Sequence, residues 1–335
     1  MTQIIMIITD KINYPVAMRI MKNLRASVKS ASSACQKNKK IIYQILYFMK
    51  NQTKTLSMLL ILAAVISFLF SACHKHCDEG CDGYTTETVS ITEPIIGVII
   101  EGPWSVSITQ SDTDNSAELK YCTSNKVKVT AQQLPNGYLK IRVTSRLNRI
   151  NFDDFKATIK ATTLEKIEGS GACNIRTYGH FESLSNISLS GASIITGLSS
   201  EGTTVKIELS GASNLKEFTF EGKKIDANFS GASIGRFDNV QVEDLQFDCS
   251  GASNINCSGY AEKTSFNGSG ASILKTLNLE SENLYIDLSG ASNAEVNVNK
   301  TIKGRASGAS ILKYRNNEGL NINVSTSGGS KLIPI

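Results

Sequence analysis

Four residues near the start of the chain are of types that bind metal ions. They follow an apolar stretch within one short segment and are His74, His76, Cys77 and Cys81. The segment is polar, contains glycine and offers no partner that would orient the ligands. We therefore interpret residues 73–83 as a tether and expect no metal. A disulfide between Cys77 and Cys81 stays open as an alternative outside the cytoplasm.

Carboxylates and a histidine could cleave a polysaccharide, which needs paired acids or a positioned base. Asp153 and Asp154 are adjacent and point to opposite faces if the chain is extended there. His180 is the only histidine after the tether. We interpret three further aspartates as isolated carboxylates at comparable outward positions on different, non-consecutive coils of a repeat: Asp226, Asp248 and Asp287. We expect no catalytic residue and no cofactor, and keep a polysaccharide lyase or hydrolase as the alternative.

The repeat is the phrase Ser-Gly-Ala-Ser or a close variant, which occurs nine times in the second half of the chain. Its copies follow one another at intervals of 18 to 20 residues and begin at Ser170, Ser190, Ser210, Ser230, Ser250, Ser269, Ser289, Ser307 and Ser327. Self-similarity at this period is typical of a solenoid, in which each repeat buries its apolar face against its neighbours. A phrase repeated nine times is a structural rule, so none of its serines is assigned as a nucleophile.

Residues before each phrase alternate between apolar and polar, as Val205, Ile207 and Leu209 do before Ser210. Alternation with period two predicts a strand with one buried face, and the glycine of each phrase permits a sharp bend. The sequence therefore predicts an all-β fold, a parallel β-solenoid resembling a single-stranded right-handed β-helix, with coils of about 20 residues. The predicted corners are Gly171, Gly191, Gly211, Gly231, Gly251, Gly270, Gly290, Gly308 and Gly328.

The residue after the phrase bears on how many phrases one coil holds. It alternates through Asn174, Ile194, Asn214, Ile234, Asn254, Ile273, Asn293 and Ile311, and ends at Lys331. One phrase per coil would stack asparagine on isoleucine, whereas two would stack like on like. We favour one phrase per coil because it suits the strand count, and the second arrangement stays open.

The front of the chain has the pattern of an export signal. Residues 49–72 combine a basic start with an apolar run that is too short for a comfortable membrane span. The run ends in Phe-Ser-Ala before Cys73, which resembles a bacterial lipobox, so Cys73 is the predicted lipid attachment site. A plain secretory signal or an anchor helix is the alternative. Residues 1–48 are interpreted as a mis-called upstream extension, or else as an unusually long basic leader.

Charge separates this leader from the rest of the chain. Residues 1–72 hold ten of the 35 Lys and Arg residues and one of the 30 acids, so residues 73–335 carry a net charge of −4. A mildly acidic body has no electrostatic footprint for nucleic acid, and we expect no such partner.

A family resemblance emerges from the region before the phrases. Residues 97–110 alternate, bend and alternate again, Asn136-Gly137 is a hairpin-type turn, and Leu139-Lys140-Ile141 reads as a strand. Followed by serial Ser-Gly phrases, this pattern resembles the head GIN domain family of putative auto-transporter adhesins over about residues 90–333. The resemblance implies a β-helix-like fold of exported, often lipid-anchored Bacteroidetes proteins, with adhesion as the proposed role and no shared catalytic residues. Residues 84–165 would then cap the solenoid of residues 166–335.

These observations predict a cell-envelope lipoprotein that presents a repetitive surface for adhesion or ligand binding. A purely structural envelope component is a further alternative. The expected partners are the membrane, through the lipid, and a glycan or a surface protein of a host or neighbouring cell. We expect an outer-membrane location, periplasmic or surface-exposed, and a monomeric body, because Pro334 cannot donate to a further strand. The varied outward residues of the predicted surface include Lys206, Glu208, Asn228, Asp248, Asp287 and Arg305.

The remaining cysteines lie in strand-like settings. We interpret Cys122, Cys173, Cys249 and Cys257 as buried free thiols that serve as small apolar residues. A bridge between Cys249 and Cys257 stays open.

Overall fold

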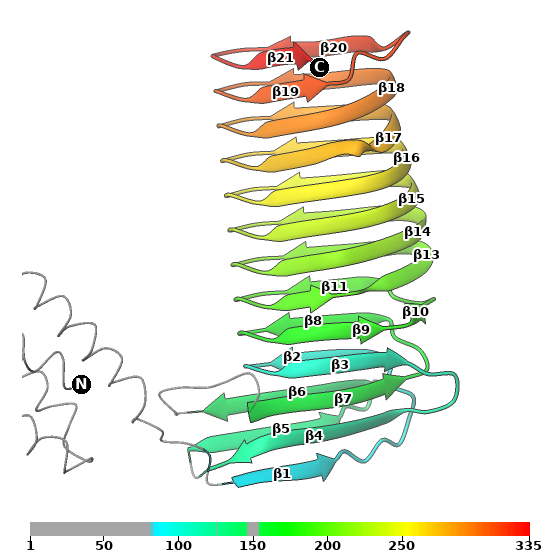
Figure 1. Ribbon diagram of the computed structural model, residues 1–335, viewed down its shortest axis with the longest axis vertical. Helices are drawn as coiled ribbons and strands as arrows, with labels where there is room; N and C mark the ends of the chain where they lie inside the picture. The colour runs from blue at the N-terminus through cyan, green and yellow to red at the C-terminus, as the bar shows by residue number, and fades with distance from the viewer. Residues whose placement is uncertain (1–80, 82, 125, 146–153) are drawn as a thin grey trace, which may run out of the picture. The chain divides into compact units, whose positions relative to one another are not determined.

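The computed structural model describes residues 81, 83–124, 126–145 and 154–335 (Figure 1). Several expectations concern residues outside this part: the extension 1–48, the signal 49–72, Cys73, most of the tether and Asp153. The compact unit Cys81–Ile335 contains all of the described residues. No helix in the described part has the length and apolarity needed to cross a lipid bilayer.

Stacked parallel coils make up most of this unit, which confirms the prediction of an all-β parallel solenoid (Figure 1). In its middle, each long strand begins directly after one phrase and ends directly before the next. These strands are β14 (Asn214–Phe229), β15 (Ile234–Cys249), β16 (Asn254–Gly268), β17 (Ile273–Leu288) and β18 (Asn293–Ala306). Each pairs in parallel with the strand one coil away. Ile194 pairs with both Asn174 and Asn214, so each coil holds one phrase, as favoured.

Shorter strands form the coils at either end of this stack. Before it lie β8 (Lys166–Ser170), β9 (Asn174–Tyr178), β10 (His180–Phe181), β11 (Asn186–Leu189), β12 (Ile194–Thr196) and β13 (Ser199–Leu209). After it lie β19 (Ile311–Tyr314), β20 (Asn321–Thr326) and β21 (Lys331–Pro334). Strands β20 and β21 continue the two sides of the solenoid by pairing with β18 and β19.

The N-terminal region begins the solenoid with a coil that lacks the phrase. Its strands β2 (Gly97–Glu101) and β3 (Ser105–Gln110) pair in parallel with β8 and β9. On their other edges they pair in parallel with β6 (Tyr138–Ser145) and β7 (Phe155–Ala161). Antiparallel strands finish this end: β5 (Val127–Gln133) on β6, β4 (Ser116–Thr123) on β7, and β1 (Gly83–Thr88) on β4.

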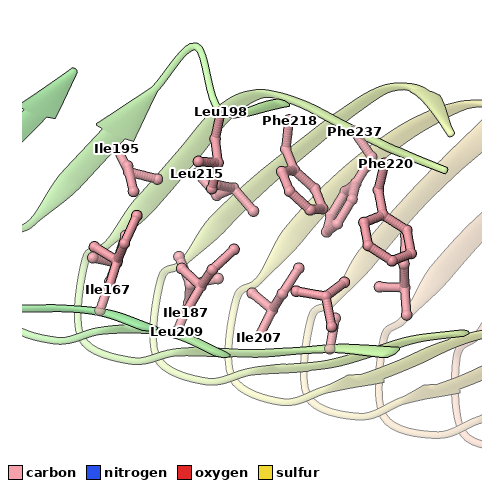
Figure 2. Close-up of a cluster of buried hydrophobic side chains, with 14 of the residues drawn as sticks. Ile167, Ile187, Ile195, Leu198, Ile207, Leu209, Leu215, Phe218, Phe220 and Phe237 are labelled. Atoms are coloured by element: carbon pink, nitrogen blue, oxygen red, sulfur yellow. The ribbon is translucent and has the colours of Figure 1, made fainter. Parts of the chain in front are cut away.

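The apolar positions of successive coils stack into ladders inside the solenoid. Ile187 pairs with Ile167 on one side and Ile207 on the other, and Figure 2 shows these side chains on one wall facing those of the opposite wall. Phenylalanines continue the filling further along, with the rings of Phe237 and Phe247 5.1 Å apart. These stacked side chains fill the interior of the coils, as is usual in close-packed protein interiors.

Each corner depends on its glycine in two ways. The nine corner glycines have φ between 68° and 87°, a region that side chains bearing a Cβ rarely adopt. The corners also stack closely: a Cβ at Gly251 would lie 2.5 Å from the carbonyl oxygen of Gly231. That carbonyl accepts the N–H of Ala252 at 2.7 Å, so the corners are hydrogen-bonded to one another along the axis.

The last serine of the phrase has a structural role inside the corner. From Ser193 to Ser310 this residue is buried. Its hydroxyl donates to the carbonyl of the first serine of the same phrase, at 2.6 to 2.8 Å. A buried hydroxyl without a partner would destabilise the fold. The partner explains why serine is kept at a buried position.

The cysteines correct one expectation. Cys122 is not free but forms a disulfide with Cys81, which also excludes the alternative bridge between Cys77 and Cys81. The reason is the antiparallel pairing of β1 with β4, which sets Tyr84 opposite Cys122 and brings the start of β1 beside it. The other three cysteines of the prediction are buried free thiols, and the bridge between two of them is not formed: Cys173, Cys249 and Cys257.

Substitution of one corner glycine tests the close stacking. We expect Gly251→Ala to lower the free energy of unfolding by at least about 3 kcal/mol, because the new Cβ is strained by φ and also meets a carbonyl oxygen. Gly319→Ala is the matched control: Gly319 has a similar φ of 78° with nothing within 4 Å, and we expect a loss of about 1–2 kcal/mol. Urea unfolding of both variants measures the difference. Equal losses would contradict the stacking account.

Removal of the disulfide tests the N-terminal region. The bridge closes a separation of 41 residues, so replacing both Cys81 and Cys122 by serine should destabilise β1 and β4 by about 2–4 kcal/mol. Hydrogen exchange should show faster exchange in β1 and β4 and unchanged protection in β14–β18. Protection unchanged in β1 and β4 would contradict the expectation.

Candidate functional site

A groove runs along the axis of the solenoid beside the corners. It has a volume of about 930 Å³ and extends past successive coils from Ser188 to Ser327. One wall is the row of outward side chains two residues before each phrase, and the other is the first serine of each phrase. We call the first of these the groove row, and in the groove its central members are Glu208, Asn228, Asp248, Asn267, Asp287 and Arg305.

The strand pattern explains why these side chains face the groove. Asp248, for example, lies between Phe247 and Cys249, which are both buried, so it points outward. Pairing joins each member of the groove row to the next one along the axis. Neighbouring members are therefore about 4.8 Å apart, the spacing of hydrogen-bonded strands.

Asp248 is the centre of a polar network in the groove. Its two carboxylate oxygens accept hydrogen bonds from Gln246 Nε2 at 2.8 Å and Asn267 Nδ2 at 2.5 Å. Gln246 lies on the same strand, whereas Asn267 lies on the next coil. The network fixes the orientation of the side chains, and each of these groups keeps lone pairs or protons for a ligand.

Ion pairs hold the two ends of the groove row. Arg305 donates to Asp287 from both Nε, at 2.9 Å, and Nη2, at 2.7 Å. The hydrogen bonds to Asp287 and its charge raise the pKa of Arg305 above its usual range. At the other end the Nζ atom of Lys206 lies 2.6 Å from Oε1 of Glu208. The hydrogen bond to Glu208 and its charge raise the pKa of the lysine. The groove is thus a polar surface of both charges.

The expectation for the three aspartates is wrong in three respects. Asp226 and Asp248 lie on adjacent coils, β14 and β15, and not on non-consecutive ones. Their positions also differ, because Asp226 stands four residues before its phrase and pairs with Gln246. Asp248 and Asp287 are not isolated either, as their hydrogen bonds show.

The spacing of the groove acids does not suit glycoside hydrolysis. A retaining mechanism needs two carboxyl groups about 5–5.5 Å apart, which adjacent coils would supply, but no two acids of the groove row lie on adjacent coils. Acids two coils apart, at about 9.6 Å, reach the limit of the inverting range. In the pair formed by Asp248 and Asp287, the carboxylate of Asp287 is also held by Arg305.

His180 belongs to a small cluster on another side of the solenoid. Its Nδ1 lies 2.9 Å from Ser199 Oγ and its Nε2 lies 3.5 Å from Glu201 Oε2. The sequence analysis missed both partners, which a spacing of one coil, 19 residues to Ser199, could have indicated. The side chains of His180 and Glu201 are about half exposed, and the strands β10 and β13 use their backbone groups in pairing. The cluster is therefore open to solvent.

The other candidate ligands are not brought together. Asp154 accepts a hydrogen bond from Tyr84 Oη at 2.9 Å, and Cys81 is held in its disulfide. Within residues 81, 83–124, 126–145 and 154–335, no three side chains of His, Cys, Asp or Glu gather closely enough to hold a metal ion. Residues 74–77 lie outside that part.

Comparison with known proteins identifies the family. The model of the family described as "Putative auto-transporter adhesin, head GIN domain" matches residues 96–317, about two thirds of the chain. The chain belongs to this family. The resemblance inferred from residues 97–110 and the serial phrases is thereby confirmed. No curated protein sequence matches the chain.

Solved structures of similar fold are described as putative adhesins and as a putative lipid binding protein. A putative adhesin from Parabacteroides merdae has a TM-score of 0.55 at 14% identity, over 76% of this chain and 98% of its own. A putative adhesin from Parabacteroides distasonis has a TM-score of 0.52 at 16% identity, over 76% and 97%. A putative lipid binding protein from the same species has a TM-score of 0.53 at 13% identity, over 76% and 98%. At these identities the likeness establishes the fold alone.

Proposed function

We propose that this protein is a lipid-anchored adhesin of the cell envelope and that the groove beside the corners is its ligand-contact surface. The observation that carries the proposal is the groove itself: a continuous open groove of about 930 Å³ that crosses many coils and has a row of ordered hydrogen-bonding groups along it. Membership of a family described as putative adhesins supports the same function.

The shape and chemistry of the groove favour an extended, polar ligand. Solenoids form elongated binding surfaces because each coil adds one set of side chains to a row. Carboxylate, amide, hydroxyl and guanidinium groups can all bond to a polar ligand at several points along its length. Cumulative weak contacts of this kind suit adhesion better than the enclosed site of an enzyme.

Lipid binding, which the name of one structural neighbour suggests for that neighbour, fits this chain less well. An acyl chain needs an apolar cavity, whereas the coils are filled by stacked side chains such as Phe237 and Phe247. The groove is lined by charged and amide side chains and by serines, and the apolar residues that also line it, such as Leu209 and Phe229, are almost fully buried. In our proposal the lipid is the one attached covalently to Cys73, and it anchors the protein in the outer membrane.

Charge removal in the groove tests the proposal. The protein, expressed from its full chain, is applied to arrays of immobilised glycans and matrix proteins. We expect reproducible binding that falls about tenfold or more when Glu208→Gln, Asp248→Asn and Asp287→Asn are combined, because hydrogen bonds to charged groups are lost.

The matched control changes the same charge elsewhere. Glu221→Gln, Glu243→Gln and Glu280→Gln remove three exposed acids on strands β14, β15 and β17, outside the groove. We expect binding within about twofold of the unmodified protein. Equal loss in both triple variants, or no binding by a folded sample, would contradict the proposal and favour a purely structural envelope role.

A further inference from the structure

The groove row has a period of two coils. Acids stand on every second coil and alternate with residues that carry no carboxylate. From the first phrase onward the row reads Glu168, Ser188, Glu208, Asn228, Asp248, Asn267, Asp287 and Arg305. Two coils span about 9.6 Å along the axis.

A second row on the other side of the corner has the same period. It consists of the residue directly after each phrase, and we call it the corner row. Parallel pairing stacks asparagine on isoleucine from Asn174 to Ile311, as Ile234 between Asn214 and Asn254 shows. Over the first eight phrases, a coil whose groove-row residue is acidic has asparagine in the corner row, and a coil without the acid has isoleucine; the ninth phrase ends the pattern with Ser325 and Lys331.

Folding alone does not explain the corner row. Alternation in the groove row keeps like charges off adjacent coils, which avoids repulsion. No such reason applies to asparagine and isoleucine, because stacked asparagines and stacked isoleucines would both make favourable ladders. Ile234 is also 45% exposed and the other isoleucines of the row are half-buried, so the alternation leaves part of each apolar side chain in reach of water.

An ancient duplication of a two-coil unit does not explain the rows either. Such a duplication would leave the same period throughout the coil. The interior row reads Ile207, Ala227, Phe247, Phe266 and Ile286, with no alternation. The outward row four residues before the phrase reads Lys206, Asp226, Gln246, Ser265 and Tyr285, again with none. The period is kept in the two rows that flank the exposed corner.

We propose that the corner and its two flanking rows bind a linear, uncharged polysaccharide whose chemical repeat is two sugars, with one repeat for every two coils. The inference rests on the proposed function and names its ligand class. In a β-1,4-linked chain successive sugars are turned by about half a revolution, so one edge presents the same substituent on every second sugar. Such a disaccharide has about the length of two coils.

Each element of the two rows has a counterpart in this ligand. The carboxylates of Glu208, Asp248 and Asp287 accept hydrogen bonds from hydroxyl or acetamido N–H groups on one edge of the chain. The isoleucines, of which Ile234 is exposed and the others are half-buried, contact the apolar C–H faces of the sugars, and the asparagines bond to their polar groups. Acids on every second coil disfavour a polyanionic polymer.

The period also separates this ligand from an extended peptide. Side chains on one face of a β-strand repeat every 6.6–6.8 Å or so, which does not match two coils. A polyproline II helix repeats about every 9.3 Å and is the nearest competitor. Its surface lacks the dense donors that three carboxylates would need, so we favour the polysaccharide.

A ladder of β-1,4-linked N-acetylglucosamine oligomers of two to eight sugars provides the test. Calorimetry or fluorescence with the protein expressed from its full chain should give affinities that rise in steps of two sugars. Dextran, an α-1,6-linked glucan, and a polyproline peptide of the same length are the comparison probes, and we expect both to bind at least tenfold more weakly.

A swap variant tests the period without changing composition or charge. Exchange of the corner-row residues Asn214→Ile and Ile234→Asn breaks the alternation, and we expect about tenfold weaker binding of the eight-sugar oligomer with an unchanged thermal midpoint. The matched control exchanges Asn256→Lys and Lys275→Asn, two exposed neighbours in the outward row two residues further on, and should bind normally. If the first swap does not fold, Asn228→Asp with Asp248→Asn repeats the test in the groove row.

The outcomes separate the inference from the proposed function. Binding of other polar ligands in the groove with a smooth dependence on length, or normal binding by the swap variant, would overturn the two-sugar repeat and leave the proposed function standing. Tighter binding of polyproline, or association of two copies through the corner rows, would overturn the polysaccharide. No ligand on any array would overturn both.

Discussion

The hydrogen bond between one corner and the next is the interaction on which the rest of this solenoid depends. From Gly171 to Gly290, the carbonyl of each corner glycine accepts the N–H of the alanine one coil later at 2.7 to 2.8 Å, for example from Ala252 to Gly231, and the carbonyl of Gly308 accepts the N–H of Gly329. Only a residue without a Cβ allows this approach at positive φ. Because every corner repeats the same contact, each coil is held at the same height and in the same register as its neighbours. The straight rows of side chains on both flanks follow from that constancy.

The regular stacking of the coils also arranges the outward side chains into rows on the surface. Parallel pairing places each outward residue directly over its equivalent, so a residue type chosen once per coil becomes a ladder about 4.8 Å apart. In the groove this brings Asp248 and Asn267 into contact although they are 19 residues apart. It also sets Arg305 onto Asp287. The chemistry of the groove is therefore the chemistry of one position in the repeat, sampled coil after coil, and a ligand that uses it must itself be repetitive.

Local signals carried most of the fold prediction. The spacing of Ser-Gly-Ala-Ser fixes the coil length, the alternation before Ser210 or Ser250 fixes the inward face, and both are readable within a single repeat. The disulfide between Cys81 and Cys122 was not predictable in the same way. It depends on antiparallel pairing of β1 with β4, two segments outside the repeat that share no periodic pattern.

The sequence predicts which side chains of the candidate site face outward, but not which residues they contact. Asp248 and Asp287 could be placed on the outside from their buried neighbours, yet their partners depend on which coil each residue belongs to. Counting from the wrong position put Asp226 in the same row as Asp248, although it stands two residues earlier in its repeat. The cluster of His180, Ser199 and Glu201 was missed because its members meet across one coil, so that only the coil spacing of 19 residues, and no local motif, indicates the contact.

Amide hydrogen exchange at the corner alanines tests the central claim most directly. The N–H groups of Ala192, Ala212, Ala232, Ala252, Ala271, Ala291 and Ala309 lie in turns whose side chains are exposed, where amides ordinarily exchange fast. If the corner hydrogen bonds hold the coils in register, these amides should be as well protected as those of β14–β18 and should exchange only when the coils separate. Exchange within seconds, while the strands remain protected, would contradict the account and assign the register to the strands alone.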